Sequence, residues 1–148
     1  MHEYFVTGPI PPGLIARVIA DQGQHKDVGA MDIFIGQVRA DEVRGQVVEA
    51  IDYSGYFEMA ERQLTKIKEA VRREYGLTGL YIYHSTGTVR AGEMCLFVLA
   101  TAGHRRTAFE GCRRAVEWIK REVPIFGKEI FAHSHEGQAT YQWKENTF

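Results

Sequence analysis

The sequence has few cysteines and no long hydrophobic run, and both absences narrow the class of protein. Cys95 and Cys112 are the only cysteines among 148 residues, and they form neither a C-x-x-C pair nor a disulfide framework. The longest apolar run, residues 94–102, is far shorter than the roughly 18 to 20 residues of a membrane span. The first residues lack the basic and apolar regions of a signal peptide. We therefore expect a cytoplasmic protein with no membrane role.

The sequence also lacks a strong excess of charge of one sign. The net charge is −1 and the pI is near 6.6, so the whole molecule has no general attraction to nucleic acid or membrane. Residues 101–129, however, contain seven basic and four acidic side chains, and this segment carries +3 against −4 for the rest. Such a basic segment suggests a small anionic ligand or an acidic partner. The alternative is a solvated helix face on which glutamates balance the cations.

Several motifs that carry chemistry are missing. The chain has no nucleotide-binding loop, zinc motif or serine-nucleophile elbow. His133 and His135 have no further ligand at metal-binding spacing, so we expect neither a metal nor a cofactor. Cys95 lies in an apolar strand pattern and Cys112 on the apolar face of a helix pattern, and both are predicted to be inert core thiols.

The hydrophobic pattern predicts a single α+β domain over residues 1–148. The apolar content of 45% suffices for a core. Helical spacing begins at Pro12 and again near Tyr56, and Gly76 ends the second helix. Strands are predicted over residues 3–6, 29–38, 47–53, 80–85, 93–101, 128–131 and 141–143.

Two further predictions concern the first long strand and the last helix. Residues 29–38 are apolar on both faces, which is typical of a central strand or one covered on both sides. Thr107 and Glu110 match a capping box that starts a helix at Thr107, and Pro124 ends that helix. Its buried face is predicted to contain Phe109, Cys112, Val116 and Ile119.

Cations of this helix point to an anion site. Arg106, Arg113 and Lys120 form one line at the edge of the apolar stripe, where charge interactions are stronger than in bulk water. The segment 103–106 precedes the helix, whose free amides and dipole favour a phosphate or carboxylate. An ordinary surface turn is the alternative for that segment.

Three blocks of the sequence resemble the large subunit of molybdopterin synthase. The first is Gly29-Ala-Met-Asp-Ile-Phe-Ile-Gly-Gln-Val-Arg39. The second is Gly103-His-Arg-Arg-Thr-Ala-Phe-Glu110, and the third is Trp118-Ile-Lys120 followed by Val123-Pro-Ile-Phe-Gly-Lys-Glu129. The spacing between the blocks also agrees, and the resemblance covers about residues 28–144.

This resemblance implies an α/β-hammerhead fold with a mixed or antiparallel sheet, flanking helices and a small subdomain. It implies a homodimer within a heterotetramer, whose small ubiquitin-like subunit inserts a C-terminal glycine thiocarboxylate. The implied substrate is cyclic pyranopterin monophosphate, which would receive two sulfur atoms to form the molybdopterin dithiolene. Residues carried over as substrate-binding are Gln37, Val38, Arg39, His104, Arg105, Lys120, Gly127, Lys128 and Glu129.

The family resemblance further implies that Lys120 and Lys128 form the catalytic pair, with one departure. The family often shows Pro-Ile-Trp-Lys-Lys-Glu, and its second essential lysine is usually the first of these two, where this chain has Gly127. We expect Lys128 to supply the missing ammonium, with Gly127 giving backbone freedom to re-aim it. The alternative is a paralogue that binds the small subunit without efficient turnover. A nucleic-acid role is not expected, because only one face is basic and no stacking platform accompanies it.

The spacing of His104 and Lys120 adds a geometric expectation. They are 16 positions apart, and on one helix they would stand about 24 Å apart. One chain with such a helix could not place both on a single pterin, so a shared site would require a second subunit. The alternative is that the helix is short or broken and the chain folds back within one subunit.

Overall fold

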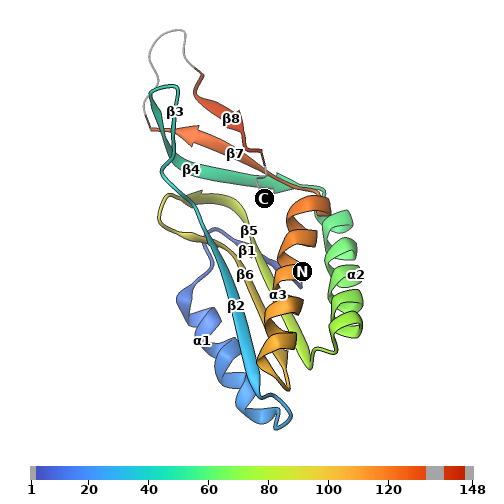
Figure 1. Cartoon of the computed structure of the whole chain (residues 1–148). Coiled ribbons are helices and arrows are strands. Elements are labelled where there is room, and N and C mark those ends of the chain that lie inside the picture. The colour runs from blue at the N-terminus through green and yellow to red at the C-terminus, as the bar shows by residue number, and fades with distance from the viewer. Residues whose placement is uncertain (1–2, 133–138, 146–148) are drawn as a thin grey trace.

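The structure is a computed structural model that describes residues 3–132 and 139–145. Three α-helices and a short 3-10 helix pack with the strands of one sheet (Figure 1). The elements, in chain order, are β1 (Phe5–Thr7), α1 (Pro12–Asp21), η1 (Gln22–Gln24), β2 (Ala30–Gln37), β3 (Glu42–Val43), β4 (Gln46–Gly55), α2 (Phe57–Tyr75), β5 (Gly79–Arg90), β6 (Met94–Ala102), α3 (Arg105–Glu122), β7 (Ile125–Phe131) and β8 (Tyr141–Trp143).

The sheet has two parts that share the long strand β5. Its strand order is β2-β6-β5-β4-β7-β8, with β1 beside β5 and β3 beside β4. Residues 79–84 of β5 pair with β6, whereas residues 87–90 pair with β4. Gly87, with a φ of +75°, lies at the start of the second part and adopts a conformation that favours glycine. Strands β3, β4, β7 and β8 thus form a smaller unit that projects from the helix-covered body (Figure 1).

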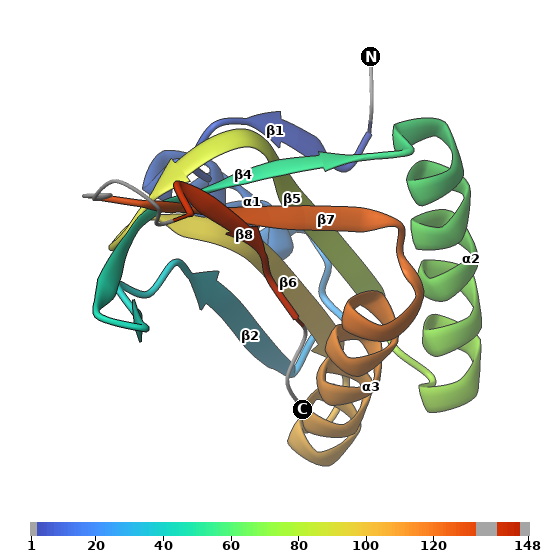
Figure 2. The ribbon, with the colours of Figure 1, turned by 90° about the horizontal axis from the view of Figure 1, so that it is seen from above.

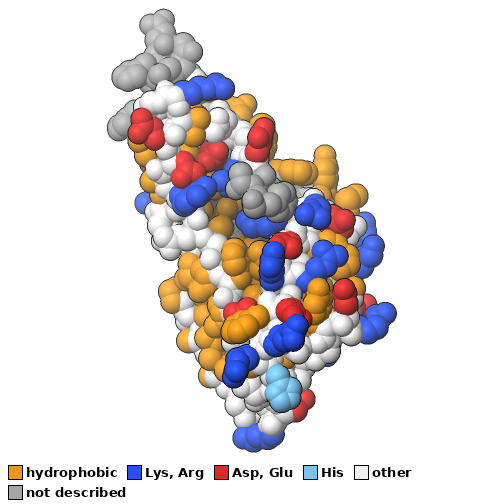
Figure 3. All heavy atoms as spheres, in the orientation of Figure 1, with side chains coloured by type: hydrophobic (Ala, Val, Ile, Leu, Met, Phe, Trp, Pro, Cys, Tyr) orange, Lys and Arg blue, Asp and Glu red, His pale blue; other side chains and the backbone are white. Residues whose placement is uncertain are grey.

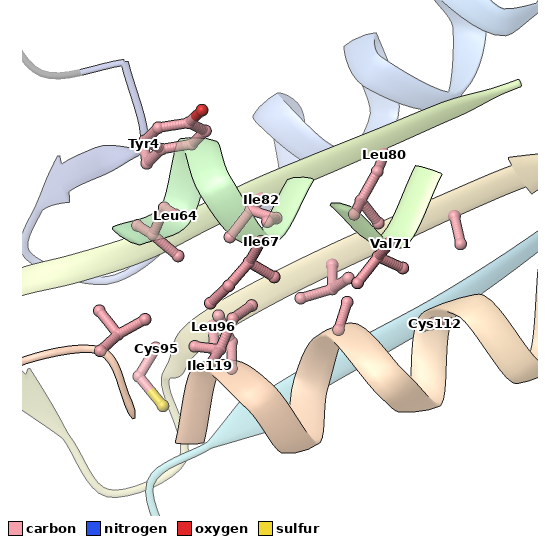
Figure 4. Packing of buried hydrophobic residues seen from close by; sticks show 14 of the residues in the cluster. Tyr4, Leu64, Ile67, Val71, Leu80, Ile82, Cys95, Leu96, Cys112 and Ile119 are labelled. Atoms are coloured by element: carbon pink, nitrogen blue, oxygen red, sulfur yellow. The ribbon is translucent and has the colours of Figure 1, made fainter. Parts of the chain in front are cut away.

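Strand β6 shows why the body needs helices on both faces. Its residues alternate between two clusters of buried side chains, as the two-residue period of a strand requires. Leu96, Val98 and Ala100 face the main core with α2 and α3, while Phe97 and Leu99 face the smaller core with α1. Helices α2 and α3 lie side by side on one face (Figure 2), and Figure 4 shows the main core between them and the sheet.

Helix α2 confirms the prediction made from its spacing. Ala60, Leu64, Ile67 and Val71 are fully buried and recur at intervals of three or four residues, so they form one continuous stripe. Gly76 ends the helix with a φ of +67°, the left-handed C-terminal cap that glycine adopts without strain.

The prediction of a central or doubly covered strand at residues 29–38 is wrong. Strand β2 is the edge of the sheet and pairs only with β6 among the described strands. One of its faces packs on α3, but Met31, Ile33 and Ile35 are 46%, 39% and 43% exposed. Figure 3 shows hydrophobic side chains gathered over β2. The local sequence shows that both faces are apolar, but it does not show that residues 3–132 and 139–145 leave the second face partly exposed.

The predicted start and buried face of α3 also need correction. The helix begins at Arg105, with His104 as its N-cap and no side-chain capping bond, so Thr107 and Glu110 lie inside it. Phe109 is 55% exposed. The buried residues of α3 are mostly small, so the helix can pack closely on α2 and the sheet with this face inward. They are Ala108, Gly111, Cys112, Ala115 and Ile119.

The α+β architecture with a mostly antiparallel sheet, flanking helices and a small subdomain is confirmed. Both cysteines are buried and free, as predicted. Within the described residues, no helix is long and apolar enough to cross a membrane. His133 and His135 lie outside the described residues.

Candidate functional site

Two adjoining hollows lie where the last turn of α3 meets the projecting part of the sheet. Their volumes are about 370 and 300 Å³, and both are lined by Tyr53, Lys120 and Lys144. We call the pair of hollows the lysine cleft. Because its three shared residues come from β4, α3 and the segment after β8, only the folded chain assembles it.

The larger hollow follows the segment that joins α3 to β7. This segment includes Val123 and Pro124, and Gly127 of β7 completes that wall. The smaller hollow extends to the end of β2 and the residues after it, where Gln37, Val38 and Arg39 line it. The cleft is therefore elongated, which is the shape required for an extended chain or for two ligands side by side.

Two neutral rings lie in the wall of the cleft. The rings of Tyr53 and His84 meet edge to face, with their centroids 5.1 Å apart. Burial lowers the pKa of His84 to about 4, opposed by its hydrogen bond to Ser85 and assisted by the charge of Lys120. Burial also raises the pKa of Tyr53 far above its usual value, and interactions with Cys95 and Glu129 raise it further. Near neutral pH both rings are uncharged.

Lys120 is a partly buried cation in this wall. Burial lowers its pKa, Cys95 opposes that shift and the positive charge of Lys144 adds to it. A partly desolvated ammonium interacts more strongly with an anion than a surface lysine does, and its lowered pKa makes it a better proton donor than an ordinary lysine. The cleft thus combines two ammonium groups with the neutral rings of Tyr53 and His84, an arrangement suited to anionic ligands.

The structure brings most of the sequence-predicted site residues to this cleft. They come from the end of β2, the end of α3 and the cleft-facing side of β7: Gln37, Val38, Arg39, Lys120, Gly127 and Glu129. Glu129 is buried and accepts a hydrogen bond from Gln142 Nε2 at 3.0 Å. Arg39 is exposed and forms an ion pair with Asp41 at 3.3 Å.

Lys128 is not among the residues that line either hollow. Side chains of a strand alternate between its two faces, and on β7 it is Gly127 and Glu129 that face the cleft. The ammonium of Lys128 instead lies 4.9 Å from the centre of the Tyr141 ring and 5.9 Å from that of Trp143. The glycine at position 127 does not redirect the side chain of Lys128, because β7 keeps its regular register through both residues.

His104 and Arg105 lie at the opposite end of α3 from Lys120, and neither lines the cleft. The predicted line of partly desolvated cations along α3 is wrong, except at Lys120. Arg106 and Arg113 are exposed and pair with the glutamates four residues later, at 3.1 and 3.0 Å. Figure 3 shows basic and acidic side chains mixed along this helix, which is the solvated face considered as the alternative.

Sequence reasoning missed several residues of the cleft, among them Tyr53, His84, Cys95 and Lys144. The first three lie in strands that pattern alone marks only as buried. The sequence did contain one signal against Lys128 as a cleft residue. Neighbouring residues of a strand point to opposite faces, so Gly127 and Lys128 cannot both face the cleft. Within residues 3–132 and 139–145, no three His, Cys, Asp or Glu side chains are grouped as a metal site.

Comparison with known proteins agrees with this architecture. Residues 9–122 match the family model described as MoaE protein. The molybdopterin synthase catalytic subunit of Oryza sativa subsp. indica is 38% identical over 132 residues, which cover 89% of this chain and 64% of that protein. The Drosophila melanogaster protein of the same name is 34% identical over 98% of this chain and 37% of its own length. The chain thus spans little more than a third of the fly protein and less than two thirds of the rice one.

Two solved structures share the fold. The crystal structure of molybdopterin synthase from Staphylococcus aureus has a TM-score of 0.78, with 26% identity and 99% coverage of both chains. A molybdopterin biosynthesis MoaE protein from Burkholderia ambifaria has a TM-score of 0.73 and 25% identity, covering 95% of this chain and 87% of that one. With the family model matching most of its length, this chain belongs to the MoaE protein family.

Proposed function

We propose that this chain is the catalytic subunit of a molybdopterin synthase. In this proposal a small ubiquitin-like subunit delivers sulfur as the thiocarboxylate at its C-terminal glycine, and cyclic pyranopterin monophosphate accepts it. Two transfers yield the dithiolene. Each transfer replaces a carbon–oxygen bond of the pterin side chain with a carbon–sulfur bond. One displaced oxygen stays on the phosphate as the cyclic ester opens, and the other leaves as water. A further water molecule then cleaves each acyl–sulfur bond, which leaves a carboxylate on the glycine tail.

The observation that carries the proposal is the position of Lys120. Its ammonium is partly buried in an elongated cleft beside two neutral rings and a second lysine. The reaction needs positive charge for a thiocarboxylate and a phosphate, and it needs a group that can transfer protons. It needs no cysteine of its own because the sulfur arrives on the partner, and both cysteines of the chain are buried. Two free thiols also fit the proposed cytoplasmic location.

The shape of the cleft supports the proposed partner. The larger hollow follows residues 119–127, and an extended glycine tail could lie along it with its charged end at Lys120. The smaller hollow, with Gln37, Val38 and Arg39 at its rim, is left for the pterin. Binding of the tail should weaken as salt rises, because the attraction is between charges at a partly exposed site.

The same proposal includes a homodimer in which each site is shared. His104 and Arg105 belong to the site only if they come from the neighbouring subunit. Strand β2 begins beside Ala102, close to the start of α3, and ends at the cleft with Gln37. Antiparallel pairing of two β2 edges about a two-fold axis would place His104 of the partner subunit near Arg39. It would also place Met31, Ile33 and Ile35 of the two subunits side by side on one face of the joined sheet.

A second candidate function is binding of the sulfur carrier without efficient turnover. The observation that favours it is Gly127, which stands where the family usually has a catalytic lysine. This paralogue would bind the thiocarboxylated partner as tightly as an active enzyme but would release no product.

A turnover assay separates the two functions. Purified chain, thiocarboxylated small subunit and cyclic pyranopterin monophosphate should yield molybdopterin at a rate proportional to the amount of chain. A small subunit that lacks its terminal glycines should give no sulfur transfer. Tight binding of the intact partner with no product would support the paralogue, and equal transfer from the truncated partner would exclude insertion of the tail.

A further inference from the structure

Lys144 is the second lysine of the cleft, and it is held beside Gly127. It follows β8 directly, and its backbone N–H donates a hydrogen bond of 2.8 Å to the carbonyl oxygen of Gly127. Lys144 and Lys120 line both hollows. The segment after β8 therefore continues the pairing with β7 and delivers a lysine to the cleft from outside the three recognisable sequence blocks.

Position 127 itself has little room for a side chain. A Cβ atom added to Gly127 would lie 2.9 Å from Ile51 Cγ2 and 3.3 Å from Tyr53 Cε1. The first of these distances is too short for an ordinary contact between carbon atoms, so a larger residue there would displace Ile51 or Tyr53. The neighbouring Lys128 lies over Tyr141 and Trp143. Neither position of β7 thus presents an ammonium to the cleft.

We infer that Lys144 supplies the second ammonium of the site, and that Lys120 and Lys144 together bind one anionic group. This inference rests on the proposed function for the identity of the anion, but not for the pairing of the two lysines. The chemistry it requires is a group with two charged acceptor atoms, such as the terminal carboxylate or thiocarboxylate of a peptide, or a phosphate. Lys144 thereby takes the role that sequence reasoning gave to Lys128.

The electrostatics of Lys120 agree with such a pair. The charge of Lys144 lowers the pKa of Lys120 and therefore lies close enough to be felt there. Two like charges in one cleft repel each other, and an anion placed between them relieves that repulsion. Other ionisable groups line the same hollows. Burial keeps His84 and Tyr53 neutral near pH 7. Cys95 and Glu129 line the smaller hollow with the two lysines, and the exposed side chains of Arg39, Arg121 and Glu122 lie at the rims. Lys120 and Lys144 are thus the two cations that line both hollows.

Three variants of the full chain test the inference. Lys144→Met removes the ammonium but keeps the backbone N–H that binds Gly127, Lys144→Arg keeps the charge, and Lys128→Met is the matched control on the other face of β7. The probes are a synthetic peptide that ends in two glycines with a free carboxylate, the same peptide with an amidated end, and inorganic phosphate. Titration calorimetry measures the affinities, and NMR of isotope-labelled lysines follows the pKa of Lys120.

Lys144→Met should weaken binding of the carboxylate peptide on the order of tenfold, as expected for loss of one charge-assisted contact. It should also raise the pKa of Lys120, while Lys144→Arg and Lys128→Met leave both quantities near wild type. Weaker binding of phosphate but not of the peptide would assign the pair to the substrate instead of the tail. Unchanged binding of both anions in Lys144→Met, or a larger loss in Lys128→Met, would overturn the inference.

Turnover separates this inference from the proposed function. If the wild type makes product, Lys144→Met should lose rate on the order of 10²-fold, because stabilisation of developing charge is lost. If the wild type makes none, the proposed function fails, yet the affinities and the Lys120 titration still decide whether the two lysines act as a pair.

Discussion

His104 caps the first turn of α3 and Lys120 lies in its last turn, so one unbroken helix holds the two residues at opposite ends. Their 16-residue separation corresponds to about 24 Å along the helix axis. A monophosphorylated pterin does not span that distance. The separation expected from the sequence is therefore present within one subunit.

Mixing two inactive variants should restore activity if the site is shared. His104→Ala and Lys120→Ala each remove one contribution from every site of a homodimer. A mixed dimer has one site with both changes and one with neither, so it should show about half of wild-type activity. Subunit exchange is verified by mass spectrometry of the native dimers. Exchange without recovery would mean that each site is built within one chain.

Lys120→Ala by itself should abolish most turnover and leave the fold intact. Lys120 is only partly buried at the end of α3, so its truncation leaves no large cavity in the core. Loss of a proton donor or of charge stabilisation should lower the rate on the order of 10²-fold or more. The control is Arg113→Ala, which removes an exposed ion pair worth about 0.5 kcal/mol and should keep its rate. Near-wild-type turnover of Lys120→Ala would remove this lysine from the mechanism.

The folded state should lose stability in acid because of His84. Its folded-state pKa of about 4 lies below the ordinary value of 6.5, so folding favours the neutral ring. The contribution of the neutral His84 ring to the free energy of unfolding is fully present above pH 6.5 and is lost as the pH falls toward 4. The loss amounts to about 3 kcal/mol of the free energy of unfolding.

Urea unfolding at pH 7 and pH 4 measures this effect. His84→Asn, which keeps a side-chain donor near Ser85, should show a smaller difference between the two pH values than the wild type. An equal difference in both proteins would assign the acid sensitivity to other groups.

Gly29→Ala should destabilise the fold where the residue before β2 packs against Gly103, which precedes α3. A Cβ at position 29 would lie 2.2 Å from the carbonyl oxygen of Gly103, and a backbone atom cannot move aside as a flexible side chain does. Overpacking of this kind costs about 1 to 3 kcal/mol. Gly23→Ala is the matched control, because nothing lies within 4 Å of its added Cβ. Thermal unfolding should show a lower Tm for Gly29→Ala alone, and equal Tm values would contradict the predicted clash.

The sequence by itself determined the elements whose pattern is strong and local. The spacing of Ala60, Leu64, Ile67 and Val71 predicted α2, and Gly76 marked its end, because both signals act within a few turns of chain. The start of α3 was missed by two residues. Its close packing also depends on small side chains such as Gly111, whose hypothetical Cβ would meet Leu77 at 2.7 Å, and a search for large apolar residues overlooks them.

The cleft itself was decided only by the tertiary structure. The sequence marked Lys120, Gly127 and the segment 37–39, each within a recognisable block, and the fold brings these together. Whether Lys128 or Lys144 accompanies Lys120 depends on which face of β7 meets the cleft and on the pairing of β7 with β8. Likewise, the apolar residues of β2 are legible in the sequence, but its place at the sheet edge is not. Pairing between distant strands sets both outcomes, and no local pattern contains that information.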